Sequence, residues 1–326
     1  LGGPIDRRCL DISDDGNYVV ACGTGESVFY WRDAKSKSGS GISPTWQNSI
    51  GDDVTAVDLS SDGDYVAAGY TISNDNSVAY WKNARTLSGT PAPDWASTEP
   101  SDVEEGIIDI AVSDDGNYVA AAAWFDTVYY WGNAKSLSGN PPTKWWSGTG
   151  ISFTSIDMSS DGDEVVAGSE GTVASTGKGV YFWSGAKGLS GKPQNPTWFY
   201  DTTPNAVEDV AINTAGDYMA AANGVLPDRV YFFDSSGNSL WNPPYQVDNP
   251  VRSLSISSDG GTLAIGTGVF VSRYLVSTGF KTPPPKPVGG YAVPVNKLAI
   301  LSPYLALLGL FGAVTLAVAA RRRRKP

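Results

Sequence analysis

Five aspartates recur at two positions of a repeated strand, and they are the side chains of this chain best suited to chemistry. Asp11, Asp58 and Asp157 share one strand position, and Asp109 and Asp209 share another. Carboxylates that converge on a channel can hold a cation or ordered water, and a pair of them can act as acid and base on a glycosidic bond. The alternative, which we favour, is that they accept hydrogen bonds from turns and neighbouring sheets.

Other catalytic arrangements are mostly excluded by composition. The chain contains no histidine, which removes Ser-His-Asp triads and histidine metal sites. The Asp-Asp-Gly-Asn turns lack the ligand series of a calcium loop, and Ser175 to Lys178 lacks the spacing of a phosphate-binding loop. We therefore predict no catalytic residues, no cofactor and no metal. The five aspartates remain the only candidates for a channel cation or for carboxylate-pair catalysis.

Two cysteines, Cys9 and Cys22, flank the first Asp-Gly turn. If the turn spans residues 14–17, the two residues lie opposite each other on adjacent strands, which allows a cross-strand disulfide. The alternative is a pair of small buried thiols, because the same columns hold Ala, Gly, Ser or Asp in other repeats.

These residues sit in a repeat marked by six anchor glycines that are 44 to 54 residues apart. Before each glycine, apolar residues alternate with other residues, which indicates a strand with one buried face. The Asp-Gly pair then favours a tight turn, and a second strand of Val and Ala follows. A third strand carries an aromatic pair. The anchors are Gly16, Gly63, Gly116, Gly162, Gly216 and Gly260.

Tryptophan marks a fourth, outer strand in five of the repeats. These residues are Trp46, Trp95, Trp145, Trp198 and Trp241. Four antiparallel strands per repeat, at this period, are typical of propeller blades. Trp124 and Trp146 lie outside the repeat columns, so we predict that they belong to a binding surface.

The Ser-x-Asp-Gly-x-Tyr-Val-Ala pattern and the Tyr-Trp strand resemble the WD-repeat-like β-propellers, in particular the repeat domains of archaeal cell-surface proteins. The resemblance covers roughly residues 5–280 and lacks the Gly-His and Trp-Asp signatures of eukaryotic WD repeats. It implies an all-β, six-bladed ring of four-stranded antiparallel blades. The sixth repeat has no outer tryptophan, so Leu1 to Ile5 are expected to supply its missing strand. A seven-bladed ring is the main alternative.

The charge of the chain argues against nucleic acid as a partner. The formal net charge is −11, although residues 321–325 contribute five positive charges. The rest of the chain holds 18 basic against 34 acidic residues, and such a surface repels phosphates.

The C-terminal part has a different composition. Residues 281–297 are rich in Pro and Gly and predict a stalk. Residues 298–320 carry no charge, and 23 residues suffice for a membrane-spanning helix. The basic tail 321–326 is then expected on the cytoplasmic side, which places the propeller, residues 1–280, outside the cell. Residues 294–304 resemble the C-terminal anchors of archaeal surface proteins, which supports the same topology.

Together these features predict a single-pass cell-membrane protein with an extracellular propeller. We expect a non-enzymatic binding or scaffolding module whose partner is an envelope protein, a glycan or another copy of the chain. It could also serve as an accessory subunit of a membrane complex. The alternative is an extracellular carbohydrate-active propeller enzyme that uses the channel carboxylates.

Overall fold

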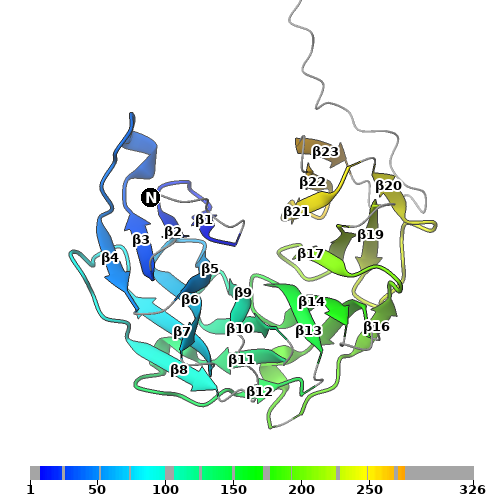
Figure 1. Ribbon diagram of the computed structural model, residues 1–326, viewed down its shortest axis with the longest axis horizontal. Coiled ribbons are helices and arrows are strands. Elements are labelled where there is room, and N and C mark those ends of the chain that lie inside the picture. The colour runs from blue at the N-terminus through cyan, green and yellow to red at the C-terminus, as the bar shows by residue number, and fades with distance from the viewer. Residues whose placement is uncertain are drawn as a thin grey trace, which may run out of the picture.

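The computed structural model describes residues 8–23, 26–50, 53–72, 75–99, 106–124, 127–148, 151–171, 177–191, 193–224, 228–247, 249–267 and 271–275. These residues form six antiparallel sheets that follow one another around an arc. We number the sheets as blades 1 to 6 in chain order. The first strand of each blade lies nearest the centre of the arc (Figure 1), as the sequence predicts.

Each of the first three blades has four strands in sequential order. Blade 1 contains β1 (Leu10–Ile12), β2 (Val19–Gly23), β3 (Ser27–Trp31) and β4 (Trp46–Ser49). Blade 2 contains β5 (Val54–Leu59), β6 (Tyr65–Ile72), β7 (Asp75–Lys82) and β8 (Trp95–Glu99). Blade 3 contains β9 (Ile107–Val112), β10 (Tyr118–Ala123), β11 (Val128–Gly132) and β12 (Trp145–Trp146).

Blades 4 and 5 repeat this order, whereas blade 6 has three described strands. Blade 4 contains β13 (Ser152–Met158), β14 (Glu164–Gly171), β15 (Gly179–Ser184) and β16 (Trp198–Asp201). Blade 5 contains β17 (Val207–Ile212), β18 (Tyr218–Asn223), β19 (Asp228–Asp234) and β20 (Tyr245–Val247). Blade 6 contains β21 (Val251–Ile256), β22 (Thr262–Thr267) and β23 (Val271–Leu275). Short 3-10 turns follow the third strand at Ala34–Ser36, Ala134–Ser136 and Ala186–Gly188.

The Asp-Gly turns are built as the sequence predicts. In blade 2, the Ser60 hydroxyl donates to Oδ1 of Asp62 at 2.8 Å, and the backbone N–H of Asp64 donates to the same oxygen at 3.0 Å. Gly63 has a φ of +72°, which an L side chain rarely adopts. The connection between the first two strands is therefore held by hydrogen bonds within the turn itself.

The hydrophobic core lies between the blades. The face of each blade that looks toward the preceding blade in the chain is its leading face, and the opposite face is its trailing face. On the trailing face of blade 1, Val20, Tyr30 and Trp46 pack against Val66 and Trp81 on the leading face of blade 2. The Tyr30 and Trp46 rings stack at 5.1 Å between centroids. Burial of such rings on both sides of each joint holds adjacent blades together.

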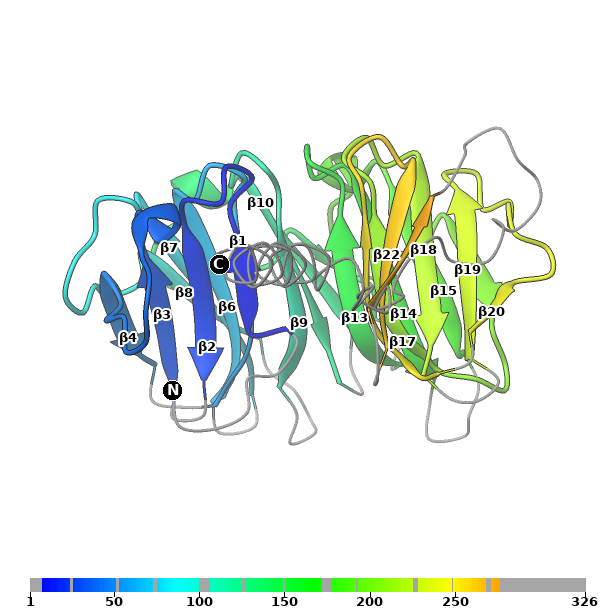
Figure 2. The same cartoon turned by 90° about the horizontal axis from the view of Figure 1, so that it is seen from above.

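Two expectations from the sequence need correction or completion. Trp241 does not begin an outer strand, because β20 begins at Tyr245; Pro243 and Pro244 lack the N–H that a strand ladder requires. In the described residues the arc is open between blade 1 and blade 6 (Figures 1 and 2).

The remaining fold predictions fall partly outside the described residues. Leu1 to Ile5, the stalk 281–297, the apolar segment 298–320 and the tail 321–326 all lie there. Within the described residues, no helix is both long enough and apolar enough to span a bilayer.

Candidate functional site

The inner strands line an open central cavity of about 260 Å³. All five aspartates of the two repeat columns line it: Asp11, Asp58, Asp109, Asp157 and Asp209. They come from five successive blades, so the repeat brings them together although they are far apart in the chain.

Each of these carboxylates accepts a hydrogen bond from the backbone of the next blade, and we call these bonds the carboxylate latches. In the first latch, Oδ2 of Asp11 accepts from the N–H of Leu59 at 3.1 Å. The others join Asp58 to Val112 at 2.6 Å, Asp109 to Ile156 at 2.9 Å, Asp157 to Ile212 at 2.9 Å and Asp209 to Leu254 at 2.6 Å. The aspartates therefore accept hydrogen bonds from neighbouring sheets, which is the role that we favoured for them from the sequence.

The cavity raises the pKa of three of the acids, chiefly because burial disfavours their charged forms. Burial raises the pKa of Asp157 to about 7. Burial and the adjacent Asp11 raise the pKa of Asp58 well above its usual range. Burial also raises the pKa of Asp11, although hydrogen bonds from Asp58 and from the backbone oppose it. Ionisation of Asp11 and Asp58 together is therefore disfavoured, because two adjacent carboxylates repel each other.

Arg8 supplies a positive charge to this acidic cavity. Its guanidinium lines the cavity and donates from Nη2 to the carbonyl oxygen of Thr154 in blade 4, at 2.8 Å. Its own carbonyl accepts from the N–H of Val57 in blade 2 at 2.8 Å. Arg8 thus connects three blades. Arg252 holds the same repeat position in blade 6 but pairs with Glu208, so the position in the repeat did not reveal the role of Arg8.

The geometry limits what the aspartates can do as ligands or catalysts. Among the described residues, no group of three His, Cys, Asp or Glu side chains is arranged to hold a metal ion. Asp11 and Asp58 are in hydrogen-bond contact, which is closer than the separation of about 5 Å between the two carboxyl groups of retaining glycosidases. The described part of the chain therefore presents no ligand set for a channel cation, which the sequence analysis named only as the less favoured alternative.

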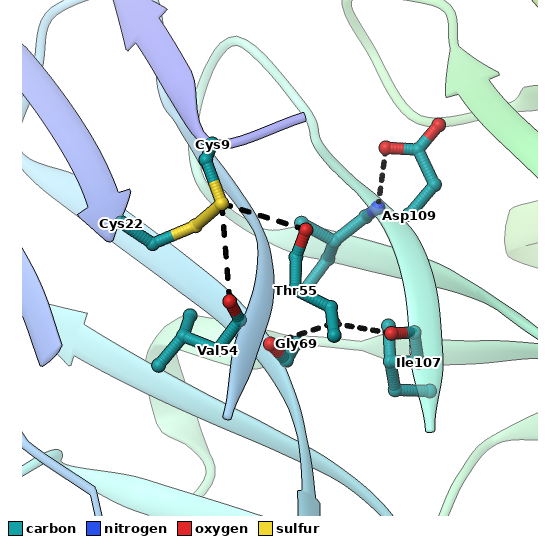
Figure 3. The surroundings of a disulfide bond; sticks show 8 residues. Cys9, Cys22, Val54, Thr55, Gly69, Ile107 and Asp109 are labelled. Carbon is teal, nitrogen blue, oxygen red and sulfur yellow. Dashed lines mark hydrogen bonds between the residues drawn. A yellow bond between two sulfur atoms is a disulfide. The ribbon is translucent and has the colours of Figure 1, made fainter. Parts of the chain in front are cut away.

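The structure joins Cys9 and Cys22 in a disulfide between the N-terminal end of β1 and strand β2, with a Cα–Cα distance of 4.7 Å. Figure 3 shows this bond beside the first strand of blade 2. The Cys9 sulfur lies 3.8 Å from the carbonyl oxygen of Val54 and 3.6 Å from that of Thr55. The disulfide therefore sits in the joint between blades 1 and 2, on the far side of blade 1 from its leading face.

The two tryptophans outside the repeat columns differ in exposure. Trp124 follows β10 and keeps 39% of its surface exposed. Trp146 is half-buried on β12 and packs against the core between blades 2 and 3. Only Trp124 is therefore placed as a surface residue.

Three further blade-to-blade contacts were not recognised in the sequence. Tyr18 packs so closely on the turn of blade 2 that a Cβ atom at Gly63 would lie 2.6 Å from it. The Tyr30 hydroxyl donates to the carbonyl oxygen of Gly63 at 2.6 Å. The Trp46 indole N–H donates to the carbonyl oxygen of Ala84 at 3.0 Å. The recurrence of these residue types in columns was the available signal, but a single sequence does not say which neighbour each side chain meets.

Comparison with known proteins supports the fold. Residues 45–82, which run from β4 through β7, match the family described as WD domain, G-beta repeat. A chain in a crystal structure of the mitotic checkpoint complex is 17% identical, with a TM-score of 0.59 over 85% of this chain and 76% of that one. A chain of Kuenenia stuttgartiensis hydrazine synthase is 16% identical, with a TM-score of 0.59 over 84% of this chain and 79% of that one.

At these identities the two solved structures establish the fold alone. No curated protein matches the sequence. The six successive antiparallel sheets give the chain the fold of a β-propeller, and residues 45–82 are similar to a WD40 repeat.

Proposed function

We propose that this chain is a membrane-anchored extracellular β-propeller that acts as a non-enzymatic binding or scaffolding module. The observation that carries the proposal is the use of all five cavity aspartates as carboxylate latches. Carboxylates that hold blades together stiffen a broad platform, and stacked repeats of this kind offer extended binding surfaces. The WD40 match supports a protein as the partner, because such propellers commonly bind proteins.

Trp124 is the residue that we assign to the binding surface. It is 39% exposed, whereas Trp46, Trp95 and Trp145 of the repeat column are buried, and exposed tryptophans often anchor a partner protein. An envelope protein is the partner that we expect first. A glycan stacked on the indole ring and a second copy of the chain are the other possibilities.

A photo-crosslinking amino acid at position 124 tests this assignment in cells that make the full chain. We expect a specific adduct at position 124 and none at position 42, where Ile42 is about equally exposed. Trp124→Ala should leave the melting temperature unchanged. When the photo-crosslinking amino acid is placed near the C-terminus, Trp124→Ala should also reduce the amount of the crosslinked partner that is recovered. Equal labelling at both positions, or none at either, would contradict the assignment.

The membrane topology requires a separate test. Truncation after residue 297 should release the propeller into the medium, because residues 298–320 are the proposed anchor. On intact cells, antibodies should bind the propeller and should not bind an epitope added after Pro326. Surface labelling of that epitope would contradict the proposed orientation.

A carbohydrate-active enzyme other than a retaining glycosidase is the second candidate, because Asp11 and Asp58 are adjacent carboxylates that line the cavity and have raised pKa values. Such pairs can activate water. If this function is correct, Asp58→Asn should abolish release of reducing sugars from envelope polysaccharides while the chain stays folded. If the parent and the Asp58→Asn variant release equal amounts of reducing sugar, or if neither releases any, the result would favour the binding module.

A further inference from the structure

The outer strands of blades 1 to 3 are paired along their outer edge with a segment of the next blade. Gln47 on β4 donates its N–H to the carbonyl oxygen of Gly89 in blade 2, and Ala96 on β8 donates to that of Gly139 in blade 3, each at 3.0 Å. The paired segments satisfy backbone groups that an edge strand otherwise leaves open. The parallel bridges join Trp46 to Gly89, Trp95 to Gly139 and Trp145 to Gly191.

The three bridging segments share the sequence Ser-Gly-x-Pro. Their glycine has a φ between +68° and +79°, which L side chains rarely adopt. In two of them the proline carbonyl accepts a hydrogen bond from a side chain of the outer strand, from Nδ2 of Asn48 and from the Ser97 hydroxyl, each at 2.8 Å. The segments are residues 88–91, 138–141 and 190–193.

Blade 5 is too short at this point to supply the segment to blade 4. In blades 2 to 4 the connection that ends at the tryptophan column has 13 residues (82–94 and 132–144) or 14 residues (184–197). In blade 5 only seven residues, 234–240, separate Phe233 from Trp241. They contain no Ser-Gly-x-Pro sequence.

The short connection of blade 5 turns back on its own strand. Ser239 forms an antiparallel bridge with Phe233, in place of a parallel bridge to the preceding blade. The connection meets blade 4 at Trp198, whose indole N–H donates to the carbonyl oxygen of Ser235 at 3.1 Å. Gly237 then packs on the same indole ring, where an added Cβ atom would lie 3.0 Å away.

The outer edge of β16 is therefore uncovered in the described part of the chain. The N–H of Thr202 donates inward to the carbonyl oxygen of Lys178 at 3.0 Å, so strand alternation turns the N–H groups of Phe199 and Asp201 outward. No described residue accepts from the outward N–H of Phe199. Phe199 is 42% exposed and Trp198 is half-buried, whereas the tryptophans of the three paired strands are at most 1% exposed.

We propose that the outer edge of β16 binds an extended segment of a partner protein that contains the sequence Ser-Gly-x-Pro and runs parallel to the strand. This edge continues the row of three such interfaces at β4, β8 and β12 on the outside of the arc (Figure 1). Those interfaces define the occupant, and strand addition of this kind is a common way to bind a peptide. The inference adds a second binding surface and does not rest on Trp124 or on the membrane anchor.

The paired blades show which bonds the partner would make. Its glycine carbonyl would accept from the N–H of Phe199, as Gly89 accepts from Gln47. Its glycine N–H would donate to the carbonyl oxygen of Thr197, as Gly191 donates to that of Lys144 at 3.2 Å. The chain itself contains Ser-Gly-x-Pro only at the three paired segments, which favours a different protein over a second copy as its source.

A synthetic copy of residues 136–142, Ser-Leu-Ser-Gly-Asn-Pro-Pro, tests the site on the full chain. We expect the NMR signals of the Phe199 and Asp201 amides to shift in a saturable way as the peptide is added. The Ala96 amide should not respond, because Gly139 already occupies its edge. The matched control peptide carries N-methylglycine in place of glycine. It should bind roughly 5-fold more weakly or worse, because it lacks the N–H that donates to Thr197.

Two substitutions on β16 test whether the backbone makes the contact. Phe199→Pro removes the outward N–H, and an edge strand tolerates proline where its N–H faces away from the sheet. Phe199→Ala removes the ring and keeps the N–H. We expect Phe199→Pro to abolish the peptide-induced shift of the Asp201 amide and Phe199→Ala to retain it, with both proteins folded by thermal unfolding. Equal loss of binding in the two variants would assign the contact to the ring and contradict the proposal.

A longer connection in blade 5 gives a measurement that needs no peptide. Residues 234–240 are replaced by a copy of residues 132–144, which carries the bridging segment of blade 3. We expect the exchange of the Phe199 amide to slow by roughly 10-fold, as for a newly formed hydrogen bond, and the peptide to bind no longer. If this chain melts at the temperature of the parent while Phe199 still exchanges as fast, β16 does not accept the segment and the proposal fails.

Other occupants of the edge give different results. Slow exchange of the Phe199 amide in the free monomer would place another part of this chain on β16, and slow exchange in a dimer would place a second copy there. Absence of any peptide-induced shift at Phe199 and Asp201 at millimolar peptide would show that the edge does not bind this sequence. Each of these results would overturn the proposal, and none of them bears on the crosslinking at position 124.

Discussion

Tyr130 is fully buried, and its hydroxyl donates to the carbonyl oxygen of Gly162 in the next blade at 2.7 Å. Tyr130→Phe removes this bond and leaves the buried carbonyl without that donor. We expect the free energy of unfolding to fall by about 1–2 kcal/mol. Urea titration of both proteins measures the change.

The chain supplies a control for this substitution. Phe182 occupies the same column in blade 4, so a phenylalanine fits the site without strain. Phe182→Tyr adds a hydroxyl directed toward the turn of blade 5 and should cost little or increase stability slightly. A loss of stability as large as that of Tyr130→Phe would indicate that ring packing, and not the hydrogen bond, explains the first result.

Asp157 gives the stability of the protein a dependence on pH. Burial raises its pKa to about 7, against about 3.9 in an unfolded chain. Between these values the folded state holds a proton that the unfolded state has released, so the contribution of Asp157 to stability is fully present below about pH 4 and is lost as the pH rises toward 7. Asp157→Asn should reduce the stability difference between pH 5 and pH 8 by about 1–2 kcal/mol, after allowance for partial solvent contact.

Denaturant titrations at the two pH values measure this difference. Asp11 and Asp58 act in the same direction, so a smaller dependence should persist in the Asp157→Asn protein. A variant with the full dependence of the parent would show that Asp157 is ionised in the folded protein at pH 5.

Gly63 shows how one hairpin turn is matched to the neighbouring blade. Both Gly63 and Gly89 have a φ near +70°, but a Cβ atom would lie 2.6 Å from Tyr18 at Gly63 and would meet nothing within 4 Å at Gly89. Gly89→Ala should therefore cost only the backbone strain of about 1–2 kcal/mol. Gly63→Ala should cost a further 1–3 kcal/mol or so, because Tyr18 must move.

Thermal and urea unfolding of the two variants separate these costs. Equal destabilisation would mean that blade 1 adjusts freely to the turn of blade 2. A larger cost at Gly63 would show that the turns are fitted to the blades that cover them.

The disulfide constrains β1 and β2 within blade 1. Its two cysteines are 13 residues apart, and closing a loop of this size in the unfolded chain corresponds to about 3 kcal/mol. The double variant Cys9→Ala, Cys22→Ala should lose about this much stability. It should also be insensitive to reducing agent, whereas the parent should fall to a similar melting temperature on reduction. Equal melting temperatures of the double variant and the oxidised parent would contradict this prediction.

Sequence patterns predicted the strands better than they predicted the joints between them. The turns at Gly16 and Gly63 were predictable because their hydrogen bonds are local. The prediction from the tryptophan column is wrong in blade 5, because the two prolines after Trp241 cannot donate to a strand ladder and β20 begins only at Tyr245. The partner of each aspartate could not be predicted, because Asp11 meets Leu59 only after two hairpins have packed face to face.

At the scale of the whole molecule, Arg8 ties opposite parts of the arc together across the central cavity. Arg8→Met removes the bond to Thr154 and a positive charge that faces the cavity aspartates. We expect a loss of about 2–3 kcal/mol. Arg252→Met is the control: its side chain is 57% exposed and its ion pair with Glu208 spans 3.5 Å, so the loss should stay below about 0.5 kcal/mol. Similar losses of stability in the two variants would show that Arg8 contributes no more than an exposed arginine does.

The carboxylate latches all run in one direction, from each blade to its successor. Each of blades 2 to 5 therefore provides a carboxylate that accepts a hydrogen bond from the blade after it. Each also provides a backbone N–H that donates to the blade before it. Tandem gene duplication of one such repeat would insert a module that fits both of its new neighbours without any compensating mutation. The number of blades can thus change in evolution by whole units, while each surface loop is left free to diverge.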